Sequence, residues 1–275
     1  MLLGDFNTLN VGRLSSIGCF LLDEDGNEVL LPQRYMPEGT MEGDELKVFI
    51  YKDSEDRYIA TTETPRAKIH ELAWLEVKDI TAHGTFLDWG LSKDLLVPKK
   101  EEIGTPKIGQ NYLAYVYRDR LTDRLAASMR LEKYLSDRPE NLSFGDPVNI
   151  WVWRPHDRGY QVVVDQEYLG MIYTNQQFEK IQIGDELTAY VNQVRDDGKI
   201  DVLLQAPGQG SVDAFAERIL KTLKSQGGRL PYHDKTDPHI IQEMFSMSKK
   251  SFKKTIGSLY KAGKIKIIDN GIELI

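Results

Sequence analysis

The stretch His83–Pro98, HGTFLDWGLSKDLLVP, decides the fold because the pattern around it occurs three times in the chain. In each copy a first glycine is followed 25 residues later by a second one. The three pairs are Gly18 and Gly43, Gly84 and Gly109, and Gly159 and Gly184. Fourteen residues after each first glycine an apolar run ends, at Pro32, Pro98 and Tyr173. Copies that begin 66 and then 75 residues apart are too long for a solenoid repeat and suit small self-contained barrels.

Residues 1–62, 63–137 and 138–207 each contain short β-rich runs separated by glycine, aspartate and proline. Such runs predict about five strands per copy, which is the number in an OB-type barrel. For the first copy, any small antiparallel barrel is an open alternative. The sequence therefore predicts a mainly β protein with three tandem OB-fold barrels, followed by one further domain.

The β pattern ends at a linker, residues 206–211, and the last domain is predicted to span 208–275. Helical spacing then appears in three segments, at 213–225, 237–245 and 249–263. Ser248 is the predicted N-cap of the third helix. The runs KIKIID and IELI, on either side of residues 269–271, predict a β-hairpin. Three helices followed by a two-stranded wing are typical of an α+β winged-helix domain.

The third predicted helix has an apolar side and a basic side. Its apolar sector is assigned to Phe252, Ile256, Leu259 and Tyr260, and its opposite face to Lys250, Lys253, Lys254 and Lys261. Gly257 lies among the lysines and would let the helix approach a phosphate backbone closely. In a winged-helix fold this is the recognition helix, so contact with nucleic acid is predicted. A solvated face, or protein docking through the wing, is the alternative.

Net charge is distributed unevenly along the chain. The formal charge of −7 is the sum of −7 in residues 1–62, +1 in 63–135, −6 in 136–210 and +5 in 211–275. Phosphate neutralisation needs local positive charge whatever the total. Polyanion binding is therefore expected in the second and fourth segments, and the first and third segments would repel a polyanion.

Several classes of protein are excluded by what the sequence lacks. The five histidines have no zinc-ligand spacing, Cys19 has no assignable base partner, and no phosphate-binding loop of the GxxxxGK type occurs. We therefore predict no enzyme, no metal and no cofactor. No stretch resembles a signal peptide or a membrane span, and a single cysteine suits a reducing compartment, so the cytoplasm is predicted.

The second copy carries the residues of a known domain type. These are Gly84 with Phe86, the run DLLVP, Gly109-Gln110 with Val116, and then Asp119, Arg124 and Ser128. This pattern resembles the RNA-binding OB-fold domain first described in ribosomal protein S1. More closely, GTFLDWGLSKDLLVP resembles the signature of the bacterial conserved virulence factor B (CvfB, YitL-like) family, which has tandem S1-type domains and a C-terminal winged helix. The resemblance implies a regulator that acts on RNA and thereby on gene expression.

The resemblance also implies which residues contact RNA. The aromatic at the position of Phe86 stacks on a base in domains of this type, and Phe20 is its equivalent in the first copy. His83 would stack or donate to phosphate, and an inert surface histidine is the alternative. Arg124, with Arg118 and Arg120 nearby, would contact phosphates, and a plain solvated charge is the alternative for each arginine. The chain departs from the pattern at Pro98, where a histidine is common. In the third copy Gln161 replaces the key aromatic, which indicates a weakened site or a structural spacer.

Alternation along the predicted strands adds further aromatic candidates. Phe49, Tyr115 and Tyr190 fall on the outward parity of their strands, where they would form either a stacking platform or the packing between neighbouring barrels. Trp151 and Trp153, beside Arg154, would either stack on single-stranded nucleic acid or pack in the core or between domains.

The predicted function is a non-catalytic, cytoplasmic RNA-binding protein that uses stacking and phosphate contacts on single-stranded RNA. One alternative is a DNA-binding transcription regulator that acts through the winged helix. Another is a scaffold that docks on the ribosome, RNA polymerase or a nuclease through its acidic domains, with protein partners in transcription, translation or RNA decay.

Overall fold

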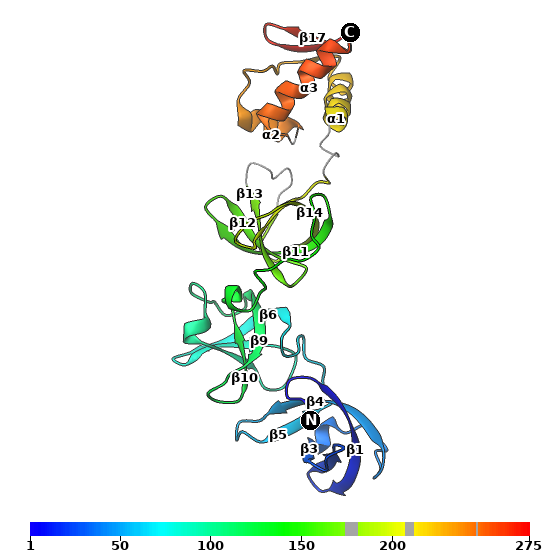
Figure 1. Cartoon of the computed structure of the whole chain (residues 1–275), viewed down its shortest axis with the longest axis vertical. Coiled ribbons are helices and arrows are strands. Elements are labelled where there is room, and N and C mark those ends of the chain that lie inside the picture. Colours follow the sequence, from blue (N-terminus) through cyan, green and yellow to red (C-terminus); the bar gives the residue numbers. More distant parts are fainter. Residues whose placement is uncertain (174–180, 207–211, 246) are drawn as a thin grey trace. The chain divides into compact units, whose positions relative to one another are not determined.

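A computed structural model describes residues 1–173, 181–206, 212–245 and 247–275 (Figure 1). The chain forms two compact units, Met1–Tyr134 and Leu135–Ile275. The fold is mainly β, with five-stranded barrels that are closed or nearly closed and a helical winged-helix region at the C-terminus. The predicted fold class is therefore confirmed. Within the described ranges, no helix has both the length and the apolar character needed to span a bilayer.

The first unit contains two barrels. Barrel 1 is closed in the order β1-β2-β3-β5-β4, from β1 (Phe6–Ser15), β2 (Gly18–Leu22), β3 (Glu28–Pro32), β4 (Glu45–Lys52) and β5 (Tyr58–Thr61). Barrel 2 has the sheet order β10-β9-β6-β7-β8, from β6 (Leu72–Thr81), β7 (Gly84–Asp88), β8 (Leu95–Pro98), β9 (Asn111–Arg118) and β10 (Leu125–Ser128). Its edge strands β8 and β10 lie next to each other, so that this barrel is nearly closed.

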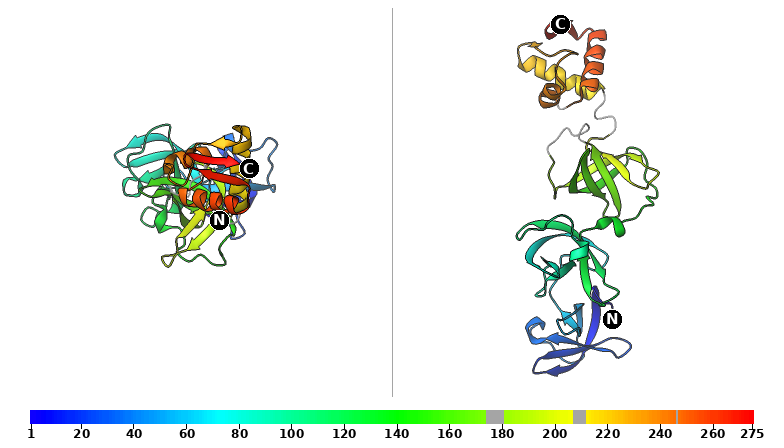
Figure 2. Two further views of the ribbon diagram at one scale, coloured as in Figure 1. Left: turned by 90° about the horizontal axis from the view of Figure 1, so that it is seen from above. Right: turned by 90° about the vertical axis from the view of Figure 1, so that its left-hand side faces the viewer.

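The second unit begins with a third barrel and ends with the winged helix. Barrel 3 is closed like barrel 1, from β11 (Pro147–His156), β12 (Gly159–Val164), β13 (Tyr168–Tyr173), β14 (Glu186–Val194) and β15 (Ile200–Leu203). The right-hand view of Figure 2 shows this barrel in green to yellow, with its strands crossing obliquely around one core. Its interior is lined with short branched side chains such as Val152, Val162 and Ile200.

The repeated glycines are explained by the way each barrel is built. The first glycine of each copy faces the residue fourteen positions later, in the register pairs Gly18 with Pro32, Gly84 with Pro98 and Gly159 with Tyr173. Their φ angles are +145°, +147° and +149°. A Cβ on Gly84 would lie 2.0 Å from the carbonyl oxygen of Val97, so only glycine fits. The second glycines also have positive φ and donate their N–H to the first strand, at Val11, Val77 and Val152.

A β-bulge interrupts the first strand of every barrel, between Val11 and Arg13, Val77 and Asp79, and Val152 and Arg154. A bulge inserts one extra residue and breaks the two-residue alternation of side chains. Trp153 is the extra residue in barrel 3, and it is only 6% exposed. Of the two alternatives for Trp153, the exposed stacking surface is therefore wrong and the core role is confirmed, whereas Trp151, before the bulge, is half-buried.

Phe49 shows how the two barrels of the first unit pack together. It is fully buried, with its ring centroid 5.7 Å from that of Trp89 in barrel 2 and 5.5 Å from that of Phe6. Both aromatic contacts are edge-on. The stacking-platform alternative is therefore wrong for Phe49, and packing between neighbouring barrels is confirmed for this residue.

The winged-helix region contains one strand more than predicted. Its elements are α1 (Val212–Ser225), β16 (Arg229–Leu230), α2 (Pro238–Phe245), α3 (Lys249–Lys261), β17 (Ile265–Ile268) and β18 (Gly271–Leu274). The short β16 pairs with β18 and makes a three-stranded sheet, and a two-residue strand leaves no periodic signal in a sequence. Figure 2 shows α3 in orange beside the red strands β17 and β18.

Helix α3 begins as predicted but buries a narrower face. Ser248 caps it, because its Oγ accepts the N–H of Ser251 at 3.1 Å. Its buried residues are Phe252, Thr255, Ile256 and Leu259. The sequence pattern assigns Tyr260 to the apolar sector, but Tyr260 is 56% exposed. That assignment is wrong because Tyr260 lies one helical step, about 100°, beyond Leu259 and so falls outside the buried stripe.

Candidate nucleic-acid interface

A groove of about 340 Å³ lies on barrel 2 where it meets strand β4 of barrel 1. We call it the barrel 2 groove. The groove is lined by residues of β7 and β8, of the segments before and between these strands, and of the turn between β9 and β10. Among them are His83, Phe86, Lys93, Leu96, Pro98, Asp119 and Arg124. Barrel 1 contributes Tyr51 and Lys52. The groove therefore belongs to both barrels of the first unit.

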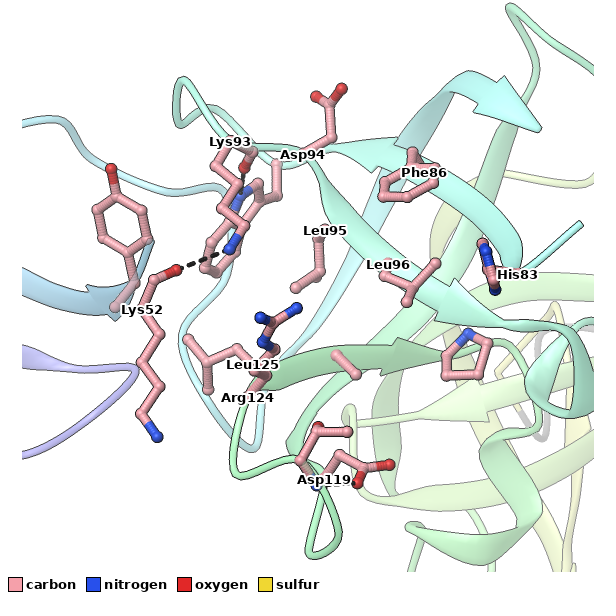
Figure 3. Close-up of a pocket in the computed structure, with 15 residues that line it drawn as sticks. Lys52, His83, Phe86, Lys93, Asp94, Leu95, Leu96, Asp119, Arg124 and Leu125 are labelled. Atoms are coloured by element: carbon pink, nitrogen blue, oxygen red, sulfur yellow. Dashed lines mark hydrogen bonds between the residues drawn. The ribbon is translucent and has the colours of Figure 1, made fainter. Parts of the chain in front are cut away.

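The structure gathers several of the residues singled out from the sequence in this groove. Phe86 pairs in register with Leu96, so the two side chains lie next to each other on one face of β7 and β8. Phe86 is half-buried and His83 is exposed. Figure 3 shows His83 and Phe86 on one side of the groove and Lys52, Lys93 and Arg124 toward the other. The arrangement offers a ring with cations across from it, which suits a base and its phosphates.

Lys93 and Asp94 of the groove have shifted pKa values. Lys93 Nζ donates to the carbonyl oxygen of Lys52 at 2.9 Å. Burial, together with the nearby Arg124 guanidinium, lowers the pKa of Lys93, and burial raises the pKa of Asp94. Asp119 Oδ1 accepts the N–H groups of Leu121 and Thr122, at 2.8 and 3.0 Å, so that carboxylate holds the turn. Asp119 therefore has a structural role before any role in binding.

The predicted arginines have different surroundings. Arg124 lines the groove and forms an ion pair with Asp56 of barrel 1. Arg118 donates from Nε to Asp123 Oδ1 at 2.6 Å and does not line the groove. Arg120 is exposed and also lies outside the groove. Of the three, only Arg124 shares a surface with Phe86.

Tyr115 is half-buried and lies outside the groove. Its ring stacks on that of Tyr134 with centroids 4.4 Å apart, and its hydroxyl lies 3.1 Å from His70 Nδ1. One ring face is therefore covered by Tyr134.

In barrel 1 the position equivalent to Phe86 is also covered. The guanidinium carbon of Arg13 lies 3.4 Å from the centroid of the Phe20 ring, and Arg13 pairs with Glu28 at 3.2 Å. Arg57, the equivalent of Arg124, pairs with Asp53 at 2.8 Å. A base that stacked on this face of Phe20 would have to displace Arg13.

Barrel 3 has a second, smaller groove at the equivalent positions. It measures about 110 Å³ and is lined by His156, Arg158, Gln161, Gly170, Met171, Tyr173, Arg195 and Lys199. We call it the barrel 3 groove. None of the described residues that line it is acidic. Arg195 donates to the Tyr173 hydroxyl at 2.7 Å and pairs with Asp201, and Lys199 pairs with Asp197 at 2.9 Å.

Sequence reasoning missed the cations of the barrel 3 groove, although the repeat could have found them. Adding 75 positions to His83, Pro98 and Arg124 gives Arg158, Tyr173 and Lys199. The net charge of −6 in this segment concealed them, because a net charge does not show where the charges lie. The same addition places Gln161 at the position of Phe86, as the sequence indicated.

The two tryptophans of barrel 3 do not form one surface. Trp151 lines a separate hollow of about 280 Å³ with Asp165 and Glu186, whose carboxylates oppose a phosphate. Trp153 is buried, with the guanidinium carbon of Arg154 4.0 Å from its ring centroid. Neither tryptophan lines the barrel 3 groove.

The lysines of α3 face solvent. All four candidates, Lys250, Lys253, Lys254 and Lys261, are exposed. A Cβ on Gly257 would meet open space, so nothing within 4 Å covers this side of the helix. Lys253 forms an exposed ion pair with Asp234, with Nζ 3.5 Å from Oδ2. The face is basic and accessible, as predicted.

Among the described residues, no group of three or more His, Cys, Asp or Glu side chains is placed to hold a metal ion. Cys19 is buried, and burial raises the pKa of its thiol.

The chain is similar to known domains and proteins over nearly its whole length. Residues 3–63 and 71–130 match the S1 domain, and residues 217–274 match the CvfB-like winged helix domain. Both domains are nucleic-acid-binding types, neither is a catalytic domain, and barrel 3 lies outside the matched ranges.

Several relatives match nearly the whole chain. YitL of Bacillus subtilis is 32% identical over 266 residues, which are 94% of this chain and 89% of that protein. Conserved virulence factor B of Staphylococcus haemolyticus is 26% identical, and that of Staphylococcus aureus 25%, each over 99% of this chain and 94% of the relative. A crystal structure of a multidomain protein with nucleic acid binding domains from Streptococcus pneumoniae is 26% identical, covers 99% of this chain and 98% of that one, and has a TM-score of 0.44.

Proposed function

Because the chain belongs to the conserved virulence factor B family, we propose that it is a non-catalytic, cytoplasmic regulator that binds single-stranded RNA and thereby acts on gene expression. The observation that carries the proposal is the barrel 2 groove, where Phe86 lies opposite Lys93 and Arg124 on an S1-type barrel. The barrel 3 groove adds a cationic surface at equivalent positions.

In the proposed mechanism an unpaired base stacks on Phe86, against the apolar floor that Leu96 and Pro98 provide. Lys93 and Arg124 neutralise the adjacent phosphates. Pro98 offers no side-chain hydrogen-bond donor at a position where a histidine is common in S1-type domains. The groove therefore makes few hydrogen bonds that distinguish one base from another. We therefore expect weak sequence preference and a strong dependence on salt.

The second unit contributes phosphate contacts in this mechanism. Arg158, Arg195 and Lys199 line the barrel 3 groove together with Tyr173, whose ring centroid lies 5.9 Å from the Arg195 guanidinium carbon. The exposed lysines of α3 extend the basic surface in the winged helix. Single-stranded RNA is flexible enough to contact grooves on separate domains, because its backbone is not held in a duplex. The division at 62, 137 and 207 into four domains is part of the same proposal.

A salt titration tests the proposal. Fluorescence anisotropy of a labelled oligouridylate with the full chain should show binding whose log K falls linearly with log salt, with a slope of about −0.7 for each phosphate contacted. Duplex DNA of the same length is the comparison. Tighter binding of the duplex would favour the transcription-regulator alternative, and no binding of either would favour a protein-docking scaffold.

Arg158→Ala should reduce the magnitude of that slope by about 0.7, because one phosphate contact is lost. Arg138→Ala is the matched control, since Arg138 is an exposed arginine of the same unit outside the barrel 3 groove. Equal slopes for the two variants would remove the barrel 3 groove from the proposed interface.

A further inference from the structure

The guanidinium of Arg124 is already occupied by a carboxylate from another barrel. Asp56 lies in the turn between β4 and β5 of barrel 1, and its Oδ1 accepts from Arg124 Nε. A second nitrogen of Arg124 donates to the carbonyl oxygen of Ser54 at 3.4 Å. The pair joins residues 68 positions apart, so it exists only because the two barrels pack together.

A second pair beside the first has the opposite polarity. Lys52 of barrel 1 lines the groove and donates to Asp123 Oδ2 of barrel 2 at 2.6 Å. Asp123 also accepts from Arg118 at 2.6 Å. Two groove cations, Lys52 and Arg124, are therefore bound to carboxylates in the free protein.

The turn of barrel 1 is preformed to present Asp56. Asp53 Oδ1 accepts the N–H groups of Glu55 and Arg57, at 2.9 and 3.0 Å, and Asp53 Oδ2 pairs with the Arg57 side chain. Asp56 has a φ of +65°, a left-handed conformation that aspartate and asparagine tolerate better than most residues. The hydrogen bond from Arg124 lowers the pKa of Asp56, so its carboxylate is ionised.

We propose that Asp56 is a built-in competitor for phosphate, through which barrel 1 restrains RNA binding in the barrel 2 groove. This inference rests on the proposed function. A carboxylate and a phosphate oxygen accept the same charge-assisted hydrogen bonds from a guanidinium, so RNA must displace Asp56 to reach Arg124. Both members of the pair are about half exposed, at 42% and 54%, and exposed pairs are weak. The Asp56–Arg124 pair therefore lowers the affinity for RNA but does not prevent binding.

Asp56→Asn removes the charge and keeps the turn, since asparagine also accepts the left-handed conformation. Binding of a labelled oligouridylate to the full chain should tighten about threefold, as expected for loss of an exposed ion pair. The slope of log K against log salt should become steeper by about 0.7, because Arg124 then releases a counterion when phosphate binds.

Glu55→Gln is the matched control. Glu55 lies in the same turn and loses the same charge, but its ion pair is with Arg57 rather than with Arg124. The RNA affinity of Glu55→Gln, and its slope of log K against log salt, should stay at the wild-type values. In an Arg124→Ala background, Asp56→Asn should not change RNA affinity, because the guanidinium for which Asp56 and phosphate compete is absent.

Equal tightening by both substitutions would mean that only overall charge matters, and would overturn the inference. So would wild-type or weaker binding by Asp56→Asn while Phe86→Ala still loses affinity, and in that case the proposed function stands. Absence of binding in every variant would overturn both.

Discussion

Phe86→Ala is expected to weaken binding of single-stranded RNA by about one order of magnitude, because stacking of a base on an aromatic ring is worth about 1–3 kcal/mol. Phe86 is half-buried beside Leu96 in the barrel 2 groove, with cations across from it. Loss of the ring removes the stacking surface and leaves the cations in place. Affinity should fall while the salt slope stays near its wild-type value, and anisotropy titrations at several salt concentrations measure both.

Two further variants separate stacking from packing. Phe86→Leu keeps an apolar side chain against Leu96 but offers no ring, so it should lose most of the affinity and retain the fold. Phe144→Ala deletes an equally large ring that is 67% exposed and lies outside both grooves, and it should bind like the wild type. If Phe86→Ala binds RNA as tightly as Phe144→Ala, the groove is not the site of stacking.

Phe20→Ala should cost less than Phe86→Ala. Arg13 already covers the ring of Phe20, so the free protein gives up a cation–π contact before a base can stack there. A loss at Phe20 as large as the loss at Phe86 would mean that both barrels bind bases equally.

The fold could be predicted from the sequence because its signals are local. Gly18 and Gly84 are required where their strands lie against the carbonyl of the facing strand, and Gly159 has the same positive φ in barrel 3. The winged helix was likewise indicated by helical spacing and by Ser248, whose capping bond depends on residues three apart. Part of the barrel 2 groove was found by resemblance, and the structure brings His83, Phe86, Asp119 and Arg124 together there with most of the DLLVP run.

What could not be predicted depends on contacts between segments distant in sequence. Alternation failed at Trp153 because a bulge shifts the side chains. At Phe49 alternation left stacking and packing between barrels as alternatives, and only the contact with Trp89 decides between them. The partner of Arg124 is Asp56, 68 positions earlier, and no spacing rule relates the two. The cations of the barrel 3 groove are a different case, because the repeat pointed to them and the net charge of the segment obscured them.

Gly84→Ala is expected to destabilise barrel 2 by about 2–5 kcal/mol, the sum of a strained backbone and an overpacked contact. The φ of Gly84 is +147°, and a Cβ there would lie 2.0 Å from the carbonyl oxygen of Val97 and 3.1 Å from the amide nitrogen of Lys99. These neighbours are backbone atoms of β8 and the turn after it, so they cannot move aside without breaking the pairing of β7 with β8. Hydrogen exchange in the full chain should show loss of protection across residues 72–128.

Gly104→Ala is the control that isolates the steric contact. Its φ is +63°, so alanine is strained there as well, but nothing lies within 4 Å of the added carbon. Its cost should be limited to about 1–2 kcal/mol of backbone strain. Peptides from residues 147–173 and 181–203, in the other unit, should keep their protection in both variants. Equal hydrogen-exchange rates in Gly84→Ala and Gly104→Ala would contradict the steric explanation of the repeated glycine. The close approach of β7 to the β8 carbonyl could then not account for the spacing of the three copies.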